Sequence, residues 1–437
     1  MFASQNAAIA KIPASSLAQR FLEVRAQSGR LVQPLSAEDC QLQSMPDASP
    51  TKWHLAHLTW FFETFVLEKF EANFKAFDAS FRVLFNSYYN GVGDKYPRPQ
   101  RGLVSRPLLQ EVMAYRAQVD ARVLDVISRA DATRHGELAQ LVMLGLHHEQ
   151  QHQELLLTDI QHALSFNPQH PAYARRWPLA STAPEPIRWH GFEGGLVRHG
   201  FDAALDGEFA FDNETPRHPV FIGPFELASR LVTNGEMIDF IADRGYQRPE
   251  LWLSMGWDWV QAGAHALPLY WQGDAGGYGH FTLQGLQGVD RHTPVCHLSY
   301  FEADALARWA GARLPTEFEW ELAARLLPAA RARSGNFVET AAYHPMPQQQ
   351  SGSEVPAQML GDVWEWTQSN YNPYPRYQPW EGVVGEYNGK FMCNQFVLRG
   401  GSCATPQSHV RASYRNFFPP DAQWQFSGLR LARDGGG

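Results

Sequence analysis

Apolar residues recur at helical spacing along the first third of the chain. Because positions three and four apart share one face of an α-helix, each segment with this spacing is predicted to be a helix with a buried side. The segments are residues 16–28, 51–70, 108–130 and 137–164. The sequence therefore predicts a four-helix bundle over residues 16–166. Its second helix is expected to begin at Pro50, with Ser49 as the N-cap.

The pattern changes beyond the last of these segments. Residues 167–187 are rich in Pro and Ala and have no periodicity, which predicts a linker. Over residues 188–433, Gly, Trp and Pro are frequent and the expected strands are short, while helical spacing is clear in residues 232–245 and 299–326. This half is predicted to be an irregular α+β domain. The whole chain is thus expected to be a two-domain α+β protein.

Composition narrows the possible partners. The net charge of −8 and the pI near 6.1 lack the basic surplus that nucleic-acid backbones require, so no nucleic-acid partner is expected. No stretch approaches 18 uninterrupted apolar residues, so no membrane partner is expected either. Cys40, Cys296, Cys393 and Cys403 stand far apart without a C-x-x-C pair. They predict neither a disulfide framework nor a zinc knuckle, and they favour the reducing cytoplasm.

Histidines and glutamates interrupt the fourth predicted helix in residues 144–157, LGLHHEQQHQELLL. His148 and His152 are four residues apart, so they project from one helix face and could hold one metal ion. A third ligand is expected from the second helix, where His54 and His57 lie among large apolar side chains. An imidazole buried there needs a polar partner, and a metal ion would supply it.

The chemistry of such a site depends on its open coordination positions. Three neutral imidazoles leave vacant positions on iron, where O2 and a substrate atom could bind, whereas a structural zinc site would be closed. Glu149 and Glu154 are then expected to orient the imidazoles without binding the metal. The H-E-x-x-H spacing is also that of zinc metalloproteases, in which Glu149 would be a general base.

Longer motifs on both sides of the linker resemble one known family. SMPDASPTKWHLAHLTWFFETF, LFNSYYNGVGDKYPRPQRGLVSRP and HHEQQHQELLLTDIQH resemble the DinB-like domain of the ergothioneine-biosynthesis sulfoxide synthases. FDNETPRHPVFIGPFELASRLVTNGE, GDVWEWTQSNY and LRGGSCATP resemble the formylglycine-generating-enzyme-like domain, related to C-type lectins, that follows it in that family. The resemblance implies that the four-helix bundle is DinB-like and that residues 188–433 form the formylglycine-generating-enzyme-like domain.

The resemblance also implies a function. Members of this family are non-haem Fe(II) enzymes that use O2 to join sulfur, or selenium in the related selenoneine synthases, to C2 of the imidazole ring of hercynine. Carried over by position, the iron ligands are His57, His148 and His152, which leaves His54 and His147 without a metal role. The implied partners are hercynine, O2 and a sulfur or selenium donor. The metalloprotease interpretation loses support because its downstream third ligand has no clear counterpart.

By the same resemblance, Arg98 and Arg101 bind the donor. A guanidinium fork suits an amino-acid carboxylate. The loop GVGDKYPRPQRG differs from the commoner family pattern AVGxRHPRPxRG at Asp94, Lys95 and Tyr96. A donor without an amino-acid carboxylate, such as a selenosugar, would relax the requirements on this loop, which slightly favours selenium.

Hercynine itself is expected to contact residues from both halves. Gln151, inside the ligand motif, is expected to touch it by resemblance. Its trimethylammonium group has no N–H to donate and is suited to aromatic faces, which Phe417 and Phe418 beside Asn416 would offer.

Phenol groups could donate a proton during the reaction or hold the substrate. Tyr88 and Tyr89 in NSYYNG and Tyr371 in EWTQSNYNPYP are the candidates for catalysis, and Tyr374 is expected to contact substrate.

Other functions stay open at this point. A DinB-type metal-dependent thiol transferase would use the same histidines with another metal and without O2. A non-catalytic ligand-binding module would use the bundle only as a support. Cysteine oxidation is not expected, because Cys393 and Cys403 are interpreted as unreactive residues of a scaffold domain.

Overall fold

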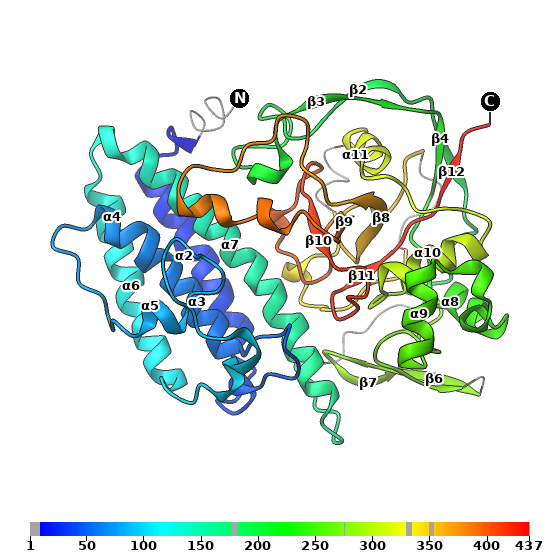
Figure 1. Ribbon diagram of the computed structural model, residues 1–437, viewed down its shortest axis with the longest axis horizontal. Coiled ribbons are helices and arrows are strands. Elements are labelled where there is room, and N and C mark those ends of the chain that lie inside the picture. Colours follow the sequence, from blue (N-terminus) through cyan, green and yellow to red (C-terminus); the bar gives the residue numbers. More distant parts are fainter. Residues whose placement is uncertain (1–8, 176–181, 275, 329–333, 349–353, 437) are drawn as a thin grey trace. The chain divides into compact units, whose positions relative to one another are not determined.

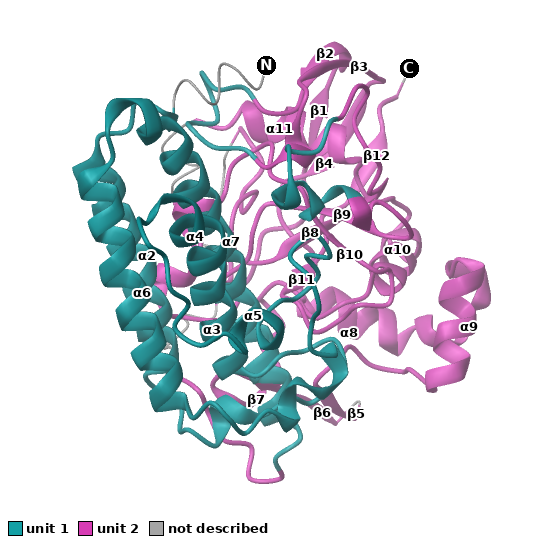
Figure 2. Cartoon of the chain, turned by 60° about the vertical axis from the view of Figure 1, so that its left-hand side comes forward, with its two compact units in different colours: residues 1–167, 202–210, 378–389 teal, residues 168–201, 211–377, 390–437 magenta. Residues whose placement is uncertain are grey.

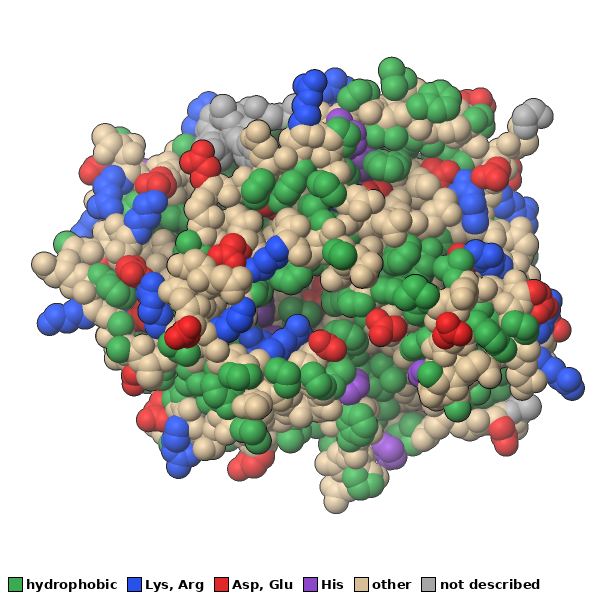
Figure 3. All heavy atoms as spheres, viewed as in Figure 1, with side chains coloured by type: hydrophobic (Ala, Val, Ile, Leu, Met, Phe, Trp, Pro, Cys, Tyr) green, Lys and Arg blue, Asp and Glu red, His purple; other side chains and the backbone are tan. Residues whose placement is uncertain are grey.

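The computed structural model describes residues 9–175, 182–274, 276–328, 334–348 and 354–436, which form two compact units (Figures 1 and 2). Unit 1 comprises Met1–Asn167, Asp202–Ala210 and Gln378–Gly389, and unit 2 comprises Pro168–Phe201, Phe211–Tyr377 and Lys390–Gly437. None of the helices in these described ranges has both the length and the apolar composition needed to cross a membrane. On the face drawn in Figure 3, Lys and Arg side chains are interspersed with Asp and Glu side chains.

Unit 1 is built on the predicted four-helix bundle. Its long helices are α2 (Ala14–Val32), α3 (Thr51–Phe62), α6 (Leu109–Arg129) and α7 (Ala132–Ser165). Helices α2 and α3 each pack against both α6 and α7. Beyond α3 the chain continues through a π-helical turn, η2 (Glu63–Leu67), into α4 (Glu68–Phe70), and the short elements are η1 (Asp39–Gln41), α5 (Phe81–Leu84) and η3 (Arg98–Leu103).

Helix α3 lies at the centre of this bundle. All 12 of its residues are buried, including Lys52, His54 and His57. Its start differs from the prediction, because the N-cap is Pro50 and no side chain caps the helix. The Ser49 hydroxyl instead accepts a hydrogen bond from Arg101 at 2.9 Å, and the Ser49 N–H donates to Asp159 at 2.8 Å. Ser49 therefore ties the helix start to two other segments of unit 1.

A buried charge cluster joins α7 to α2 and α6. Glu149 accepts hydrogen bonds from Arg25 at 2.9 Å, from Arg116 at 2.5 Å and from the Ser28 hydroxyl at 2.6 Å. Burial alone raises the pKa of Glu149, but the two guanidinium groups more than offset it and lower the pKa to about 2. The cluster thus holds α7 against α2 and α6, and Arg25 also donates to Thr59 of α3 at 3.2 Å.

Two segments that follow the linker in the sequence complete unit 1. In residues 202–210, the Phe209 ring stacks on His147 with centroids 4.0 Å apart. In residues 378–389, the helical turn η8 (Val383–Glu386) presents Glu386, which accepts a hydrogen bond from Gly91 N–H at 2.8 Å. Neither segment was expected in the bundle, since each lies within the part of the sequence that predicts the second domain.

Unit 2 is the irregular α+β domain. Its sheets have the strand orders β1-β4-β12, β10-β9-β8-β11, β2-β3 and β5-β6-β7. The strands are β1 (Trp189–Phe192), β2 (Gly195–His199), β3 (His218–Ile222), β4 (Phe225–Ala228), β5 (Trp271–Asp274), β6 (Gly277–Thr282), β7 (Gly285–Gly288), β8 (Trp364–Asn370), β9 (Phe396–Arg399), β10 (Asn416–Phe418), β11 (Ser427–Gly428) and β12 (Ala432–Asp434). Neighbouring strands are often distant in sequence, so the sheets depend on long-range pairing.

The helical periodicity of unit 2 corresponds to three α-helices. Residues 232–245 contain α8 (Asn234–Ala242), and residues 299–326 contain α10 (Tyr300–Trp309) and α11 (Glu317–Arg325). A fourth, α9 (Ser254–Gly263), was not predicted. The shorter turns are η4 (Asp212–Glu214), η5 (Gly245–Gln247), η6 (Pro249–Leu251), η7 (Val338–Thr340), η9 (Gly389–Phe391) and η10 (Gln407–His409). In the described part of the expected linker, residues 167–175 and 182–187, there is no helix or strand.

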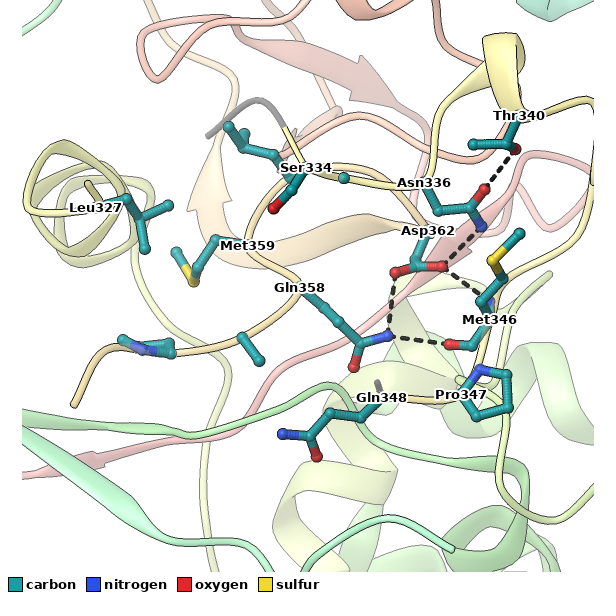
Figure 4. Close-up of a pocket in the computed structure, with 14 residues that line it drawn as sticks. Leu327, Ser334, Asn336, Thr340, Met346, Pro347, Gln348, Gln358, Met359 and Asp362 are labelled. Carbon is teal, nitrogen blue, oxygen red and sulfur yellow. Dashed lines mark hydrogen bonds between the residues drawn. The ribbon is translucent and has the colours of Figure 1, made fainter. Parts of the chain in front are cut away.

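The GDVWEWT motif holds unit 2 together. Glu365 pairs with Arg430 at 2.9 Å, and both side chains are fully buried. Next to it, Asp362 accepts hydrogen bonds from Asn336 at 2.8 Å, from Met346 N–H at 2.8 Å and from Gln358 at 3.0 Å (Figure 4). These residues line a cavity of about 250 Å³. Because the carboxylate is already held by three donors, the motif has a structural role here.

The buried cluster around Glu149 predicts a large stability effect. Glu149→Gln should lower the free energy of unfolding by about 3–5 kcal/mol, because it leaves Arg116 buried without a paired carboxylate and leaves Arg25 with Asp120 alone. Urea unfolding at pH 7, followed by far-UV circular dichroism, measures the change. Glu137→Gln is the matched control, since Glu137 lies on α7 but is exposed beside Lys69, and its effect should stay below about 1 kcal/mol. Similar small losses in both variants would contradict the assignment.

The contribution of Glu149 to the free energy of unfolding should also decrease at low pH. Its pKa is lowered from 4.5 to about 2 in the folded protein. The carboxylate therefore stabilises the fold fully above about pH 4.5 and loses this effect as the pH falls toward 2. The stability difference between the native chain and Glu149→Gln should shrink across that window, as measured by urea unfolding at stepped pH values. A constant difference would exclude this linkage.

Candidate metal centre

Three histidines of unit 1 converge on one point. Helix α3 supplies His57, and α7 supplies His148 and His152. One ligand nitrogen from each ring lies within 4.8 Å of the others, and the Nε2 atoms of His57 and His148 are 3.3 Å apart. The spacing of four residues on α7 brings the second pair together, as the sequence predicts. The structure therefore gathers the three expected ligands from two helices.

The His57 ring is fixed on all sides. Its Nδ1 is 2.7 Å from the carbonyl oxygen of Phe85, which can only accept, so Nδ1 carries the hydrogen and Nε2 keeps its lone pair. Trp53 stacks on the imidazole with centroids 4.6 Å apart, and Trp60 stacks at 5.5 Å. The free lone pair points toward His148, as a metal ligand requires.

The electrostatics of the triad keep the imidazoles neutral. Burial lowers the pKa of His148 to about 3. Burial, followed by the neighbouring imidazoles, also lowers the pKa of His57 and of His152 well below the usual value. Neutral imidazole is the form that binds a metal ion.

A divalent metal ion fits this donor set. Imidazole nitrogens bind metals such as zinc at about 2.0–2.1 Å, so ligand nitrogens 3–5 Å apart can share one ion. His57 and His148 are buried, whereas His152 is partly exposed. Further ligands could therefore reach an ion from the His152 side, unlike in a closed structural site.

His54 lies beside the triad. It does not belong to the triad, but its Nδ1 lies 2.8 Å from Nδ1 of His152, and its Nε2 lies 3.0 Å from Oδ2 of Asp159. His147, by contrast, stacks on Phe209. The sequence thus did not distinguish His54, which contacts a ligand histidine, from His147, which does not.

The expected role of Glu149 is wrong. Its carboxylate is held by Arg25 and Ser28 of α2 and by Arg116 of α6. The same contacts argue against a general base at this position. Glu154 is buried, and its expected role in orienting the imidazoles stays a prediction.

The two arginines of the YPRPQRG loop differ in environment. Arg101 is buried, lies 3.4 Å above the Trp53 ring and donates to Ser49. Burial, followed by the charge of Arg98, lowers the pKa of Arg101 to about 9. Arg98 is about half exposed and donates to the backbone oxygen of Asp47. Trp53 thus lies between Arg101 and His57, so one arginine belongs to the surroundings of the triad.

The tyrosine that packs against the triad was missed by sequence reasoning. Tyr387, at the end of η8, has its ring 5.5 Å from that of His148, and its hydroxyl donates to the Gln151 side chain. Tyr88 lies at 6.3 Å from the Tyr387 ring and stacks on Tyr89, which is fully buried. No sequence pattern links residue 387 to the histidines, because the connection exists only in the folded unit.

The other predicted site residues belong to unit 2. Tyr371 accepts a hydrogen bond from Asn213 at 2.9 Å, and the Tyr374 hydroxyl lies 2.8 Å from Nε2 of His199. Phe417 stacks on Tyr371 with centroids 4.0 Å apart. With Asn416 and Phe418 it forms the partly exposed strand β10. The roles of these residues toward substrate stay predictions.

The cysteines on either side of β9 differ in exposure. Cys393 is exposed and Cys403 is buried, and all four cysteines are free thiols. Burial raises the pKa of Cys40 and of Cys296 to about 12, so these two are protonated at neutral pH.

Comparisons with known proteins cover both units. Residues 191–352 and 335–435 match the sulfatase-modifying factor enzyme 1-like domain family, and residues 20–156 match the DinB superfamily. The chain is 34% identical to a hercynine oxygenase of Mycobacterium tuberculosis, across 96% of this chain and 98% of that protein. A hercynine oxygenase of Mycolicibacterium smegmatis is 32% identical, across 97% and 100%. A formylglycine-generating enzyme of Streptomyces coelicolor is 30% identical across 60% of this chain and 96% of that protein.

The converging histidines predict stoichiometric metal binding. His57→Ala and His148→Ala should each weaken the binding of a divalent ion at least about 100-fold, since a four-ligand zinc site binds with about 10–16 kcal/mol in total. Anaerobic equilibrium dialysis with elemental analysis measures the affinity. His135→Ala is the matched control, because His135 lies on α7 and contacts the Ile12 carbonyl instead. Equal affinity in all variants would show that the triad is not the binding site.

Proposed function

The chain belongs to the hercynine oxygenase family, and we propose that it uses Fe(II) and O2 to join a sulfur or selenium atom to C2 of the imidazole ring of hercynine. The convergence of His57, His148 and His152 carries this proposal, because it provides an open three-nitrogen site in a chain related to those enzymes over nearly its full length. O2 would take up the electrons released when the C2–H and chalcogen–H bonds give way to a carbon–chalcogen bond.

The three histidines would hold the iron. Fe(II) bound there would supply the capacity to bind O2 and to exchange electrons with it. The residues around the triad determine what else can enter. Trp53 and Trp60 cover the faces of His57, so access is left to the partly exposed side near His152 and Gln151.

Hercynine would bind next to the His148–His152 face. Gln151 and Tyr387 form a hydrogen-bonded pair there, and an amide offers both a donor and an acceptor to an imidazole ring. For the trimethylammonium group we propose Phe417 and Phe418 beside Asn416. These residues are partly exposed, so a cation could reach their rings. Each cation–π contact would contribute about 0.5–2 kcal/mol.

A tyrosine hydroxyl would donate a proton during the reaction. We propose Tyr387 for this role beside the sequence-based candidates Tyr88, Tyr89 and Tyr371. The packing of Tyr387 on His148 supports it, whereas Tyr89 is fully buried within unit 1. Burial raises the pKa of Tyr89 and of Tyr371, so both keep their hydroxyl hydrogens at neutral pH.

The sulfur or selenium donor would bind near the two arginines of η3. Arg101 is held by Trp53 and Ser49, so it presents a fixed charge, while Arg98 is about half exposed and would exchange its hydrogen bond to the Asp47 carbonyl for one to a carboxylate. The free thiols of the chain fit a reducing compartment, and we propose the cytoplasm.

One assay tests the activity. Iron-loaded protein with hercynine, O2 and a donor should form a product whose mass shows one new carbon–chalcogen bond. The donors to compare are cysteine, γ-glutamylcysteine and a selenosugar. Without O2 no product should form, and His148→Ala should be inactive while His135→Ala keeps full activity. Turnover that continues without O2 would favour a DinB-type thiol transferase instead.

The effect of substituting Arg98 on the KM for the donor should show whether the donor carries a carboxylate. If the donor carries a carboxylate, Arg98→Gln should raise the KM for it about 10–100-fold, because a hydrogen bond to a charged group is worth about 1.5–3 kcal/mol. The KM of a selenosugar without a carboxylate should stay unchanged. Steady-state kinetics with both donors on the same variant distinguish the two cases, and Arg82→Gln, another exposed arginine of unit 1, is the control.

A further inference from the structure

A chain of hydrogen bonds leads away from the triad at His152. Its Nδ1 lies 2.8 Å from Nδ1 of His54, and Nε2 of His54 lies 3.0 Å from Oδ2 of Asp159. The Ser49 N–H donates to the same oxygen at 2.8 Å. Only 2% of His54 and 6% of Asp159 are exposed, so bulk water does not compete for these bonds. The contacts join the start of α3 to the second half of α7.

The hydrogen positions follow from the partners in this chain. A backbone N–H can only donate, so Oδ2 of Asp159 accepts from Ser49 and offers a second lone pair to His54. Nε2 of His54 then carries the hydrogen, and its Nδ1 is an acceptor in the neutral ring. His152 must supply the hydrogen between the two Nδ1 atoms, which leaves Nε2 of His152 bare. The reverse order would place a hydrogen on that Nε2 and block metal binding.

We propose that Asp159 and His54 are positioning residues that fix the tautomer and the ring orientation of His152, so that its Nε2 lone pair faces the metal. This inference rests on the proposed function in that it takes the triad to hold the iron. A carboxylate acting on a metal ligand through an intervening imidazole extends the usual arrangement, in which the ligand histidine donates directly to a carboxylate or carbonyl.

Of the three ligand histidines, His152 is the one whose nitrogen away from the metal is hydrogen-bonded to a side chain. The remote nitrogen of His57 is fixed by the Phe85 backbone carbonyl, which no substitution removes. The remote nitrogen of His148 has no hydrogen-bond partner among the described residues, and this ring is held by packing against Phe61 and Tyr387. The relay through His54 and Asp159 is therefore the place where a side chain can set the state of a ligand.

Iron affinity tests the relay without relying on activity. His54→Leu removes both nitrogens and should weaken Fe(II) binding about 10–100-fold, as loss of such outer partners typically does. Asp159→Leu should act in the same direction. His54→Gln should recover much of the affinity, because one amide can donate to Asp159 and accept from His152. His135→Leu, with its contact to the Ile12 carbonyl, is the matched control and should bind as the native chain does.

The tautomer can be read in the metal-free protein. With 15N-labelled histidine, the imidazole of His152 should show a protonated Nδ1 and a bare Nε2 in the native chain, and this pattern should be lost in His54→Leu. His152→Gln identifies the signals by their absence. Because the tautomer is read in the native chain, this result does not depend on whether His54→Leu folds.

The outcomes separate the relay from the proposed function. If the native chain fails to bind Fe(II), the proposed function fails. If the native chain binds Fe(II) but His54→Leu binds it equally well, the relay is wrong and the metal centre stands. A protonated Nε2 on His152 in the native metal-free protein would also overturn the relay.

Discussion

The burial of three neutral imidazoles against one another is the constraint on which unit 1 depends. Each ring carries one donor and one acceptor nitrogen, and an apolar interior offers partners for few of them. Helix α3 is buried throughout, so His57 can be satisfied only by the Phe85 carbonyl and by whatever the triad holds. Stability and metal binding are therefore two results of the same packing.

The orientation of α7 follows from a buried charge cluster beside the ligands. Glu149 is adjacent to the ligand His148, yet it faces Arg25 and Arg116. The carboxylate anchors α7 to α2 and α6, and this contact fixes the rotation of the helix that directs His148 and His152 toward His57 on α3. A charge pair that never touches the metal thus determines where two of its ligands point.

The sequence predicted the parts of this site that local spacing encodes. Helical periodicity identified the bundle, and the interval of four residues placed His148 and His152 on one face. The role of Glu149 was misjudged because its arginine partners lie 33 and 124 residues away in the chain. Tyr387 was missed for the same physical reason, since its contact with His148 arises from folding across more than half of the sequence. Spacing also cannot show which neighbouring histidine, His54 or His147, shares a hydrogen bond with a ligand.

The segments 202–210 and 378–389 have a consequence for how this protein could be divided. Both lie after the linker in the sequence, yet they fold as part of the bundle that carries the histidines. A fragment that ended at residue 167 would keep the three imidazoles but would lack Phe209 and Tyr387. The two halves are consequently interleaved rather than joined end to end, and recombination at the linker would not exchange complete sites between relatives.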